Sequence, residues 1–241
     1  MIESYASLLL IGPFPHGPVG GLALTLILSV LGVGFAFPLS IAIALCRLSP
    51  YFLVQAPATA LVYVVRGVPL LLLLFWSYFL VPVLIGHVVS AFTTLVVTLV
   101  IYQAAYMSEV VRAGIQALPK GQLEAARTLG MSYPKAMHLV ILPQALFNMV
   151  PSLLNQFIST VKETSVGYVI SVQELTFSAG QINADLLTKP FQVYLALSLI
   201  YFLVCYSLSQ AVQLIERRVV ARRSRLPSKP QRNLYDSVQP G

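Results

Sequence analysis

Charged residues and cysteines are scarce in this chain. Only 10% of its 241 residues are charged, and eight are acidic, whereas charged residues make up about a quarter of an ordinary soluble domain. The two cysteines, Cys46 and Cys205, lie far apart within apolar segments, so we expect packing residues and not a disulfide framework. This composition disfavours a soluble domain.

The sequence also lacks the residue groups on which many enzymes depend. Its histidines, His16, His87 and His138, are isolated from one another and from any cysteine or aspartate at metal-ligand spacing. It contains neither a serine nucleophile elbow nor a G-x-x-x-x-G-K-S/T phosphate-binding loop. The inverted repeats of many secondary transporters are absent as well. We therefore predict no catalytic residue, metal ligand, cofactor or nucleotide site, and we disfavour an enzyme and a secondary transporter.

Long apolar runs without charge are present instead, and each is about as long as the roughly 20 residues that a helix needs to cross a bilayer. The five runs are Gly20–Leu45, Gly67–Gly86, Val88–Ser108, Leu139–Val161 and Pro190–Ile215. Because only helices and closed barrels satisfy their backbone groups in lipid, we predict an all-α membrane protein with five transmembrane helices. This single domain spans residues 19–220, after a leader at 1–18 and before a basic tail at 221–241 that we expect to be disordered.

The basic residues fall on one side of the predicted spans. Twelve of the 15 lysines and arginines are Arg47, lie between Arg112 and Lys135, or follow from Arg217 onward. Loops rich in lysine and arginine stay in the cytoplasm, so we predict an N-terminus outside, a polar island at 109–138 inside and a cytoplasmic C-terminus. The tail favours contact with the lipid bilayer over nucleic acid, because it lacks an aromatic stacking platform.

A polar stripe runs along the fourth predicted span. At 100° per residue its members fall within about an 80° arc, and Glu163 lies beside them. The stripe consists of Gln144, Asn148, Ser152, Asn155, Ser159 and Lys162. Such residues can hydrogen-bond between helices, but polar groups along a whole span usually face a cavity. We favour a water-accessible pathway over interhelical hydrogen bonding.

Two pairs of charged residues each leave two interpretations open. Glu109 and Arg112, spaced i,i+3, could form an interfacial ion pair or take part in solute contact. Lys162 and Glu163 could supply both charges that a zwitterion needs in a low-dielectric site, or they could form a structural salt bridge. For solute contact the favoured residues are Glu163, Lys162, Asn155, Ser159, Asn148 and Glu109.

The island between the third and fourth spans reads PKGQLEAARTLGMSYPKAMHLVILP over residues 119–143. We predict a short amphipathic helix at Leu118–Leu129, a left-handed turn at Gly130 and a second short helix at Tyr133–His138. A compact polar segment between two membrane spans is typical of contact with a soluble partner.

The spacing of this island resembles the EAA loop of ABC importer permeases. The family pattern is E-A-A-x3-G-x9-I-x-L-P, and the chain matches it from Glu124 to Pro143 except for Val140 in the isoleucine position. Further stretches resemble the polar amino-acid branch of that family, over roughly residues 18–220. They are YVVRGVPLLLLLF, YMSEVVRAGIQALPKGQLEAARTLGMS and VKETSV. In VKETSV, Glu163 and Val166 stand where the branch has aspartate and leucine, which leaves the solute open.

The resemblance implies a type I ABC importer permease whose residues 118–138 form a coupling loop docked on a cytosolic ATPase. The residues implied in ATPase coupling are Glu124, Ala125, Ala126, Gly130 and Met131. The chain is then a permease subunit, and not an enzyme, in the bacterial cytoplasmic (inner) membrane. It carries polar amino acids of the histidine/glutamine/arginine type inward, driven by ATP hydrolysis on a separate subunit. The alternative is another small solute, such as an opine-like compound or an osmolyte.

The same resemblance implies the partners. They are two copies of the ATPase subunit, a second permease chain that is identical or a paralogue, and an extracytoplasmic solute-binding protein.

Overall fold

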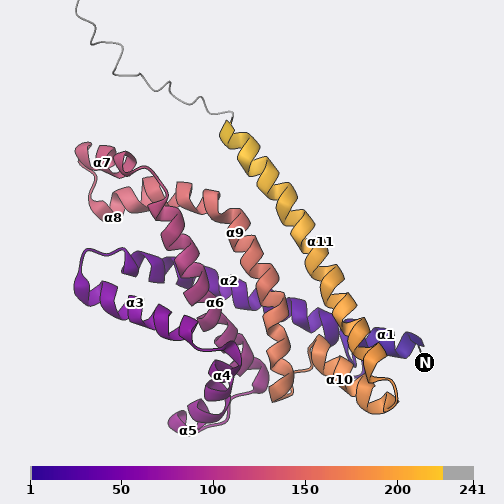
Figure 1. The fold of residues 1–241 in the computed structure, drawn as a ribbon. Helices are drawn as coiled ribbons and strands as arrows, with labels where there is room; N and C mark the ends of the chain where they lie inside the picture. Colours follow the sequence, from indigo (N-terminus) through magenta and orange to yellow (C-terminus); the bar gives the residue numbers. More distant parts are fainter. Residues whose placement is uncertain (1, 225–241) are drawn as a thin grey trace, which may run out of the picture.

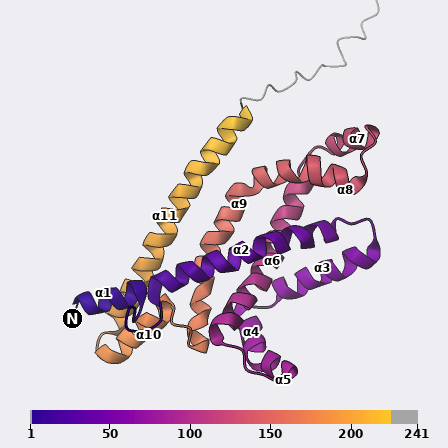
Figure 2. The ribbon, with the colours of Figure 1, turned by 180° about the vertical axis from the view of Figure 1, so that it is seen from behind.

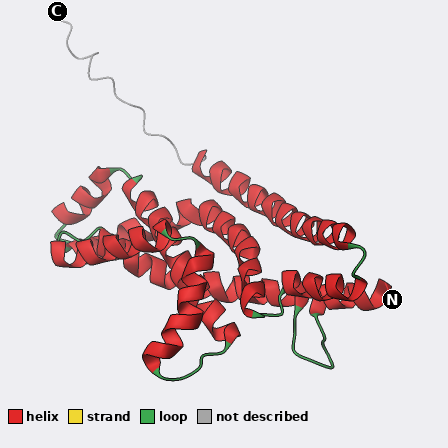
Figure 3. Ribbon diagram, turned by 60° about the horizontal axis from the view of Figure 1, so that its bottom comes forward, coloured by secondary structure: helices red, strands yellow, loops and turns green. Residues whose placement is uncertain are grey.

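A computed structural model describes the backbone of residues 2–224 and the side chains of residues 5–217. Within this part of the chain every regular element is a helix, and the one strand-like contact is an isolated bridge between Gly21 and Glu174 (Figure 3). The helices before the polar island are α1 (Ile2–Ile11), α2 (Gly21–Arg47), α3 (Phe52–Gly67), α4 (Leu70–Phe75), η1 (Trp76–Leu80), α5 (Val81–Ile85) and α6 (Ala91–Gln116). Those from the island onward are α7 (Lys120–Thr128), α8 (Tyr133–Ala136), η2 (Met137–Ile141), α9 (Leu142–Glu163), η3 (Thr164–Ile170), α10 (Leu175–Leu186) and α11 (Pro190–Ser224).

Four helical segments are long and apolar enough to cross a membrane singly, and a fifth candidate is a bent pair. The single segments are α2, α6, the continuous run from α8 to η3, and α11. The pair joins α3 to the run Leu70–Ile85 at an angle of 106°. The architecture therefore confirms the predicted all-helical membrane fold of up to five spans.

The second span differs from the single transmembrane helix predicted for Gly67–Gly86. Val68 is extended, with φ −106° and ψ 134°, as expected because a following proline disfavours the helical region. Pro69 then precedes the first residue of α4. The run Leu70–Ile85 is only about 24 Å long at 1.5 Å per residue, so it is short for a bilayer core of about 30 Å. The helix break at Val68 and Pro69 joins α3 to this run as a bent pair, the form of a broken span or a re-entrant loop.

Helices α2 and α6 pack closely at the centre of the fold. Small residues on one face of α2 are buried, as their periodicity predicts for close packing. They are Thr25, Ser29, Gly32, Ala36 and Ser40. The hydroxyls bond to the backbone of their own helix, and a Cβ added at Gly32 would lie 3.4 Å from the side chain of Leu99 on α6. This face of α2 thus serves packing and not solute contact.

The two ends of the molecule are distinct (Figures 1 and 2). Helix α7 and the C-terminal end of α11 lie toward one end, while α5 and α10 lie toward the other. Little of α11 is buried within this chain, so most of its surface is open to lipid or to another chain. Helix α11 continues to Ser224, and the rest of the tail predicted as disordered lies outside the described residues.

Candidate functional site

The coupling segment ends its first helix in a defined backbone motif. After α7 the N–H of Gly130 donates to the carbonyl of Arg127 at 3.0 Å, and the N–H of Met131 donates to the carbonyl of Ala126 at 3.2 Å. These two bonds form a Schellman motif, which requires a left-handed residue after the helix. Gly130 has φ +85°, so the left-handed turn predicted at this position is confirmed.

Helix α7 has one packed face and one free face. Ala126 is buried and Leu123 packs against the hydrophobic cluster at the ends of α2, α6 and α9. Glu124 and Ala125 are exposed, whereas Met131 is half-buried. A cavity of ≈ 320 Å³ lies between α7, the C-terminal end of α6 and the helices α8 and η2. The free face therefore presents Glu124 and Ala125 outward from the fold.

The polar stripe of α9 lies on the side that faces away from this chain's own core. Four of its members are exposed and two, Asn148 and Ser159, are half-buried. Gln144 bonds to the carbonyl of Val140 on its own helix, and within the described residues the other five make no side-chain hydrogen bond. Hydrogen bonding between helices of this chain therefore does not explain the stripe.

Glu163 and Lys162 point to different surroundings, so within the described residues they form no ion pair. Lys162 is exposed. The Glu163 carboxylate instead accepts a hydrogen bond from the Nε2 of Gln103 on α6. The Oε1 of Gln103 accepts one from the Nε2 of Gln156 on α9, at 2.7 Å. Of the two alternatives that the sequence left open for Lys162 and Glu163, the structural salt bridge is not formed within the described residues.

These two glutamines were not identified as site residues from the sequence. Gln103 is fully buried although it lies in an apolar span, and Gln156 follows a member of the stripe but points to α6. The available signal was the amide itself, because a polar group inside a span usually has an interior partner.

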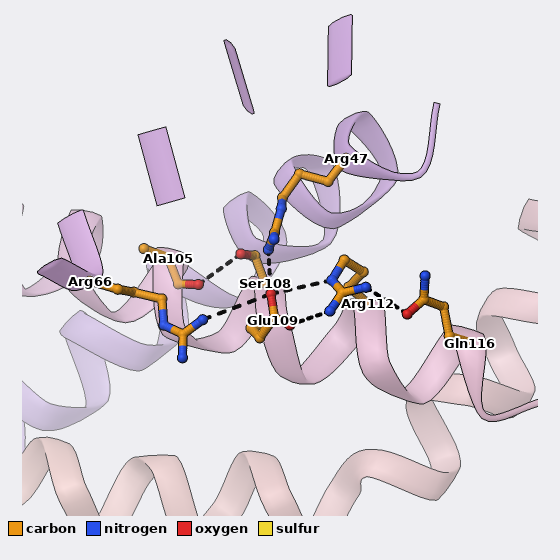
Figure 4. Close-up of polar contacts among 7 residues, drawn as sticks. All are labelled: Arg47, Arg66, Ala105, Ser108, Glu109, Arg112 and Gln116. Atoms are coloured by element: carbon orange, nitrogen blue, oxygen red, sulfur yellow. Dashed lines mark hydrogen bonds and ion pairs between the residues drawn. The ribbon is translucent and has the colours of Figure 1, made fainter. Parts of the chain in front are cut away.

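Glu109 lies at the centre of a second cluster (Figure 4). Its carboxylate is 2.6 Å from Nη1 of Arg47 and 3.8 Å from Nη1 of Arg66, and it also accepts hydrogen bonds from Arg112. The predicted pair with Arg112 is confirmed, while the partners on α2 and α3 were not anticipated. Both carboxylate oxygens are occupied, so this geometry favours a structural ion pair over contact with a solute ammonium.

The structure keeps these two clusters apart. Gln103, which holds Glu163, and Glu109 are six residues apart on α6, which is about 9 Å along a helix axis. Tyr106 lies between them in sequence, and its hydroxyl accepts a hydrogen bond from the hydroxyl of Tyr102 at 3.2 Å. Glu163 and Glu109 therefore belong to separate polar sites.

A third polar group is buried at the end of the molecule opposite α7. Glu174 is fully buried and caps α10. It accepts backbone hydrogen bonds from Thr176 and Phe177, both at 2.9 Å, and a hydroxyl hydrogen bond from Tyr201 on α11 at 3.2 Å. Burial raises the pKa of Glu174 from 4.5 to about 7, although these donors act in the opposite direction.

We expect Glu174 to make the stability of this end pH-dependent. Its folded-state pKa lies above the ordinary value, so folding favours the protonated form. The contribution is complete below about pH 4.5 and is lost as pH rises through about 7. The unfolding temperature in detergent should therefore fall across this window, and Glu174→Gln should remove the fall. Asp185→Asn, at an exposed carboxylate, should keep it. An equal fall in Glu174→Gln would assign the pH dependence to another group.

The fold and these sites define a polytopic membrane protein with an exposed helical segment between two spans. Comparison with known proteins then gives the family. The model of the binding-protein-dependent transport system inner membrane component matches residues 34–221. The chain therefore belongs to this family.

Individual relatives agree. The inner membrane amino-acid ABC transporter permease protein YhdY of Escherichia coli K12 is 39% identical over 83% of this chain, which spans 55% of its length. The probable glutamine ABC transporter permease protein GlnM of Bacillus subtilis 168 is 37% identical over 81% of this chain and 89% of its own. The crystal structure of an amino acid ABC transporter with histidines has a TM-score of 0.75 and 38% identity, over 82% of this chain and 92% of that one.

A more distant structure shares the fold. An inward-facing MetNI methionine ABC transporter structure has a TM-score of 0.66 at 21% identity, over 81% of this chain and 92% of that one. The predicted class, a permease subunit of an ABC importer and not its ATPase, is confirmed by the family and its relatives. The protein is a multi-pass component of the inner membrane that works with ATPase and binding-protein subunits.

Proposed function

We propose that this permease carries polar amino acids along a pathway lined by the polar stripe of α9 and by Glu163. The observation that carries the proposal is the stripe itself, which runs the length of a span and whose members other than Gln144 make no side-chain hydrogen bond in the described part of this chain. Relatives support the solute class, since they are named for glutamine, glutamate/aspartate and arginine transport. The residues proposed to line the pathway are Asn148, Asn155, Ser159, Lys162 and Glu163.

The open side of α9 supports a second permease chain as its neighbour. A stripe of amides and hydroxyls facing lipid alone would leave polar groups without hydrogen bonds in hydrocarbon, where each costs several kcal/mol. A second permease, identical or a paralogue, could cover this side and enclose water between the two stripes. With one coupling segment on each permease, the assembly takes two ATPase subunits.

The free face of α7 supports ATPase docking. Glu124 and Ala125 are exposed, and the small alanine permits close approach of a partner backbone. Ala126, Gly130 and Met131 fix the shape of this face through the Schellman motif. Because α7 packs on the cluster that joins α2, α6 and α9, a push on α7 can move these spans together.

The placement of basic residues supports an inside location for α7. Lys120, Arg127 and Lys135 lie in or beside it, and lysine and arginine are retained in the cytoplasm. With that assignment the N-terminus is outside, the C-terminus is cytoplasmic, and the solute-binding protein meets the end that carries α5 and α10.

ATP-dependent uptake into proteoliposomes tests the solute class. The vesicles contain the permease with its co-purified ATPase and sister permease, the cognate binding protein is added, and radiolabelled glutamine, glutamate, arginine and histidine are compared. We expect uptake of at least one. ATP hydrolysis with uptake of none would exclude this solute class and favour an opine-like compound or an osmolyte.

We expect Glu163→Gln to reduce uptake about tenfold while the complex assembles normally. A hydrogen bond to a charged group contributes about 1.5–3 kcal/mol, and the change removes the charge that would pair with a solute ammonium. Asp185→Asn is the matched control, because Asp185 is an exposed carboxylate on α10. Uptake by Glu163→Gln at the wild-type rate would remove Glu163 from the pathway.

A further inference from the structure

The pair of glutamines between α6 and α9 gives Glu163 a fixed, neutral hydrogen-bond partner. Gln103 is fully buried, and its two amide ends are both used, one on Glu163 and one on Gln156. Within the described residues all ion pairs involve Glu109. Glu163 is therefore held by a neutral donor and forms no ion pair within the described residues.

The direction of the hydrogen bonds orients the amide. An ionised carboxylate can only accept hydrogen bonds, so Gln103 must turn its NH₂ group toward Glu163. Its carbonyl oxygen then needs a donor, and Gln156 provides one at 2.7 Å. If Gln156 were absent, the Gln103 amide could turn and present its oxygen to the carboxylate, which is repulsive.

One oxygen of Glu163 remains open. Gln103 bonds to Oε2, and Oε1 has no partner within the described residues. The buried oxygens without partners in that part of the chain belong to Gln122 and Gln173, so Oε1 of Glu163 is accessible. An accessible carboxylate oxygen that is uncompensated in a span is suited to an incoming cation.

We propose that Gln103, oriented by Gln156, is a positioning residue that holds the Glu163 carboxylate for the ammonium group of the transported solute. This inference rests on the proposed function, in which Glu163 contacts the solute. Gln103 does not touch the solute itself. It uses the inner oxygen of Glu163 and thereby directs the outer one to the pathway, so the solute class is one with an N–H-bearing cation.

A double-mutant cycle tests this relation. The affinity of the purified complex, without binding protein, is measured by scintillation proximity with whichever of radiolabelled glutamine, glutamate, arginine and histidine is taken up best. We expect Gln103→Leu to raise the Kd about tenfold in the wild-type background. In the Glu163→Gln background it should change the Kd less than twofold, because a residue that acts through Glu163 has nothing left to position.

Two further variants separate positioning from folding. Gln156→Met, at a half-buried site, should weaken affinity in the same direction by a smaller factor, again only when Glu163 is present. It also serves if Gln103→Leu does not assemble. Thr98→Val removes a buried hydroxyl from α6 that bonds to its own helix, and it should leave the Kd unchanged.

The outcomes distinguish this inference from the proposed function. A wild-type Kd in Gln103→Leu, or an equal loss in both backgrounds, would overturn the positioning role and leave solute contact by Glu163 intact. A wild-type Kd and uptake rate in Glu163→Gln would overturn both.

Discussion

Replacing Gly130 by valine is expected to lower ATP-driven uptake by roughly 5- to 30-fold while the permease still reaches the membrane. Gly130 has φ +85°, and a left-handed backbone costs an L-residue about 1–2 kcal/mol, with a β-branched side chain at the upper end. Every 1.4 kcal/mol changes an equilibrium about tenfold. That strain therefore lowers the fraction of permease whose α7 surface has its docking shape by the stated factor. No atom lies within 4 Å of a Cβ added at Gly130, so the effect comes from the backbone and not from crowding.

The same helix offers a matched control. Gly121 lies within α7, lacks a positive φ and also has open space around an added Cβ. Gly121→Val should therefore retain uptake, and Gly130→Asn should retain most of it, because asparagine tolerates the left-handed region. Uptake and the yield of co-purified ATPase are measured together. Gly130→Val with wild-type values for both would contradict the coupling role proposed for α7.

The turn at Gly130 could be predicted because its signals are local. A helix-forming stretch, a glycine and a second helix follow one another within about 20 residues, and the Schellman motif needs only backbone groups of neighbouring residues. The membrane spans were predictable for a similar reason, since each is a continuous apolar run. The bend at Val68 and Pro69 was missed because a proline near a helix start is compatible both with one straight span and with a break.

The polar clusters could be predicted only in part, because their members come from distant parts of the chain. Glu109 and Arg112 share a helix turn, and their pair was expected. Arg47 lies 62 residues from Glu109, and Gln103 lies 60 residues from Glu163. Such pairs depend on how α2, α6 and α9 pack, and periodicity within one helix does not contain that information. The sequence also favoured both Glu109 and Glu163 for solute contact, whereas the structure gives the two carboxylates separate partners.

Glu109→Gln is expected to destabilise the permease by about 3 kcal/mol, which makes it the most destabilising of the single changes proposed. Removing one partner of a buried ion pair costs about 3–5 kcal/mol, and the side chains of Arg47 and Glu109 are 5% and 27% exposed. Partial exposure of Glu109 places the value at the lower end. The change leaves three guanidinium groups, those of Arg47, Arg66 and Arg112, without their shared carboxylate.

The arginines should rank by burial and distance. Arg47→Gln should lower the unfolding temperature nearly as much as Glu109→Gln, because Arg47 is buried at 2.6 Å. Arg66→Gln should have a small effect, because Arg66 is 35% exposed at 3.8 Å. Glu216→Gln, at an exposed acid on α11, is the control. Equal effects for Arg47 and Arg66 would contradict this ranking.

Thermal unfolding and uptake of these variants, measured side by side, decide between the two interpretations of Glu109. If the cluster is structural, the unfolding temperature and the uptake of Glu109→Gln decline together, and uptake recovers at lower temperature, where the folded fraction is restored. If Glu109 contacts the solute, uptake is lost while the unfolding temperature of Glu109→Gln stays equal to that of the Glu216→Gln control. The occupied carboxylate oxygens of Glu109 lead us to expect the first result, since a carboxylate already shared by three guanidinium groups has no free oxygen for a solute ammonium.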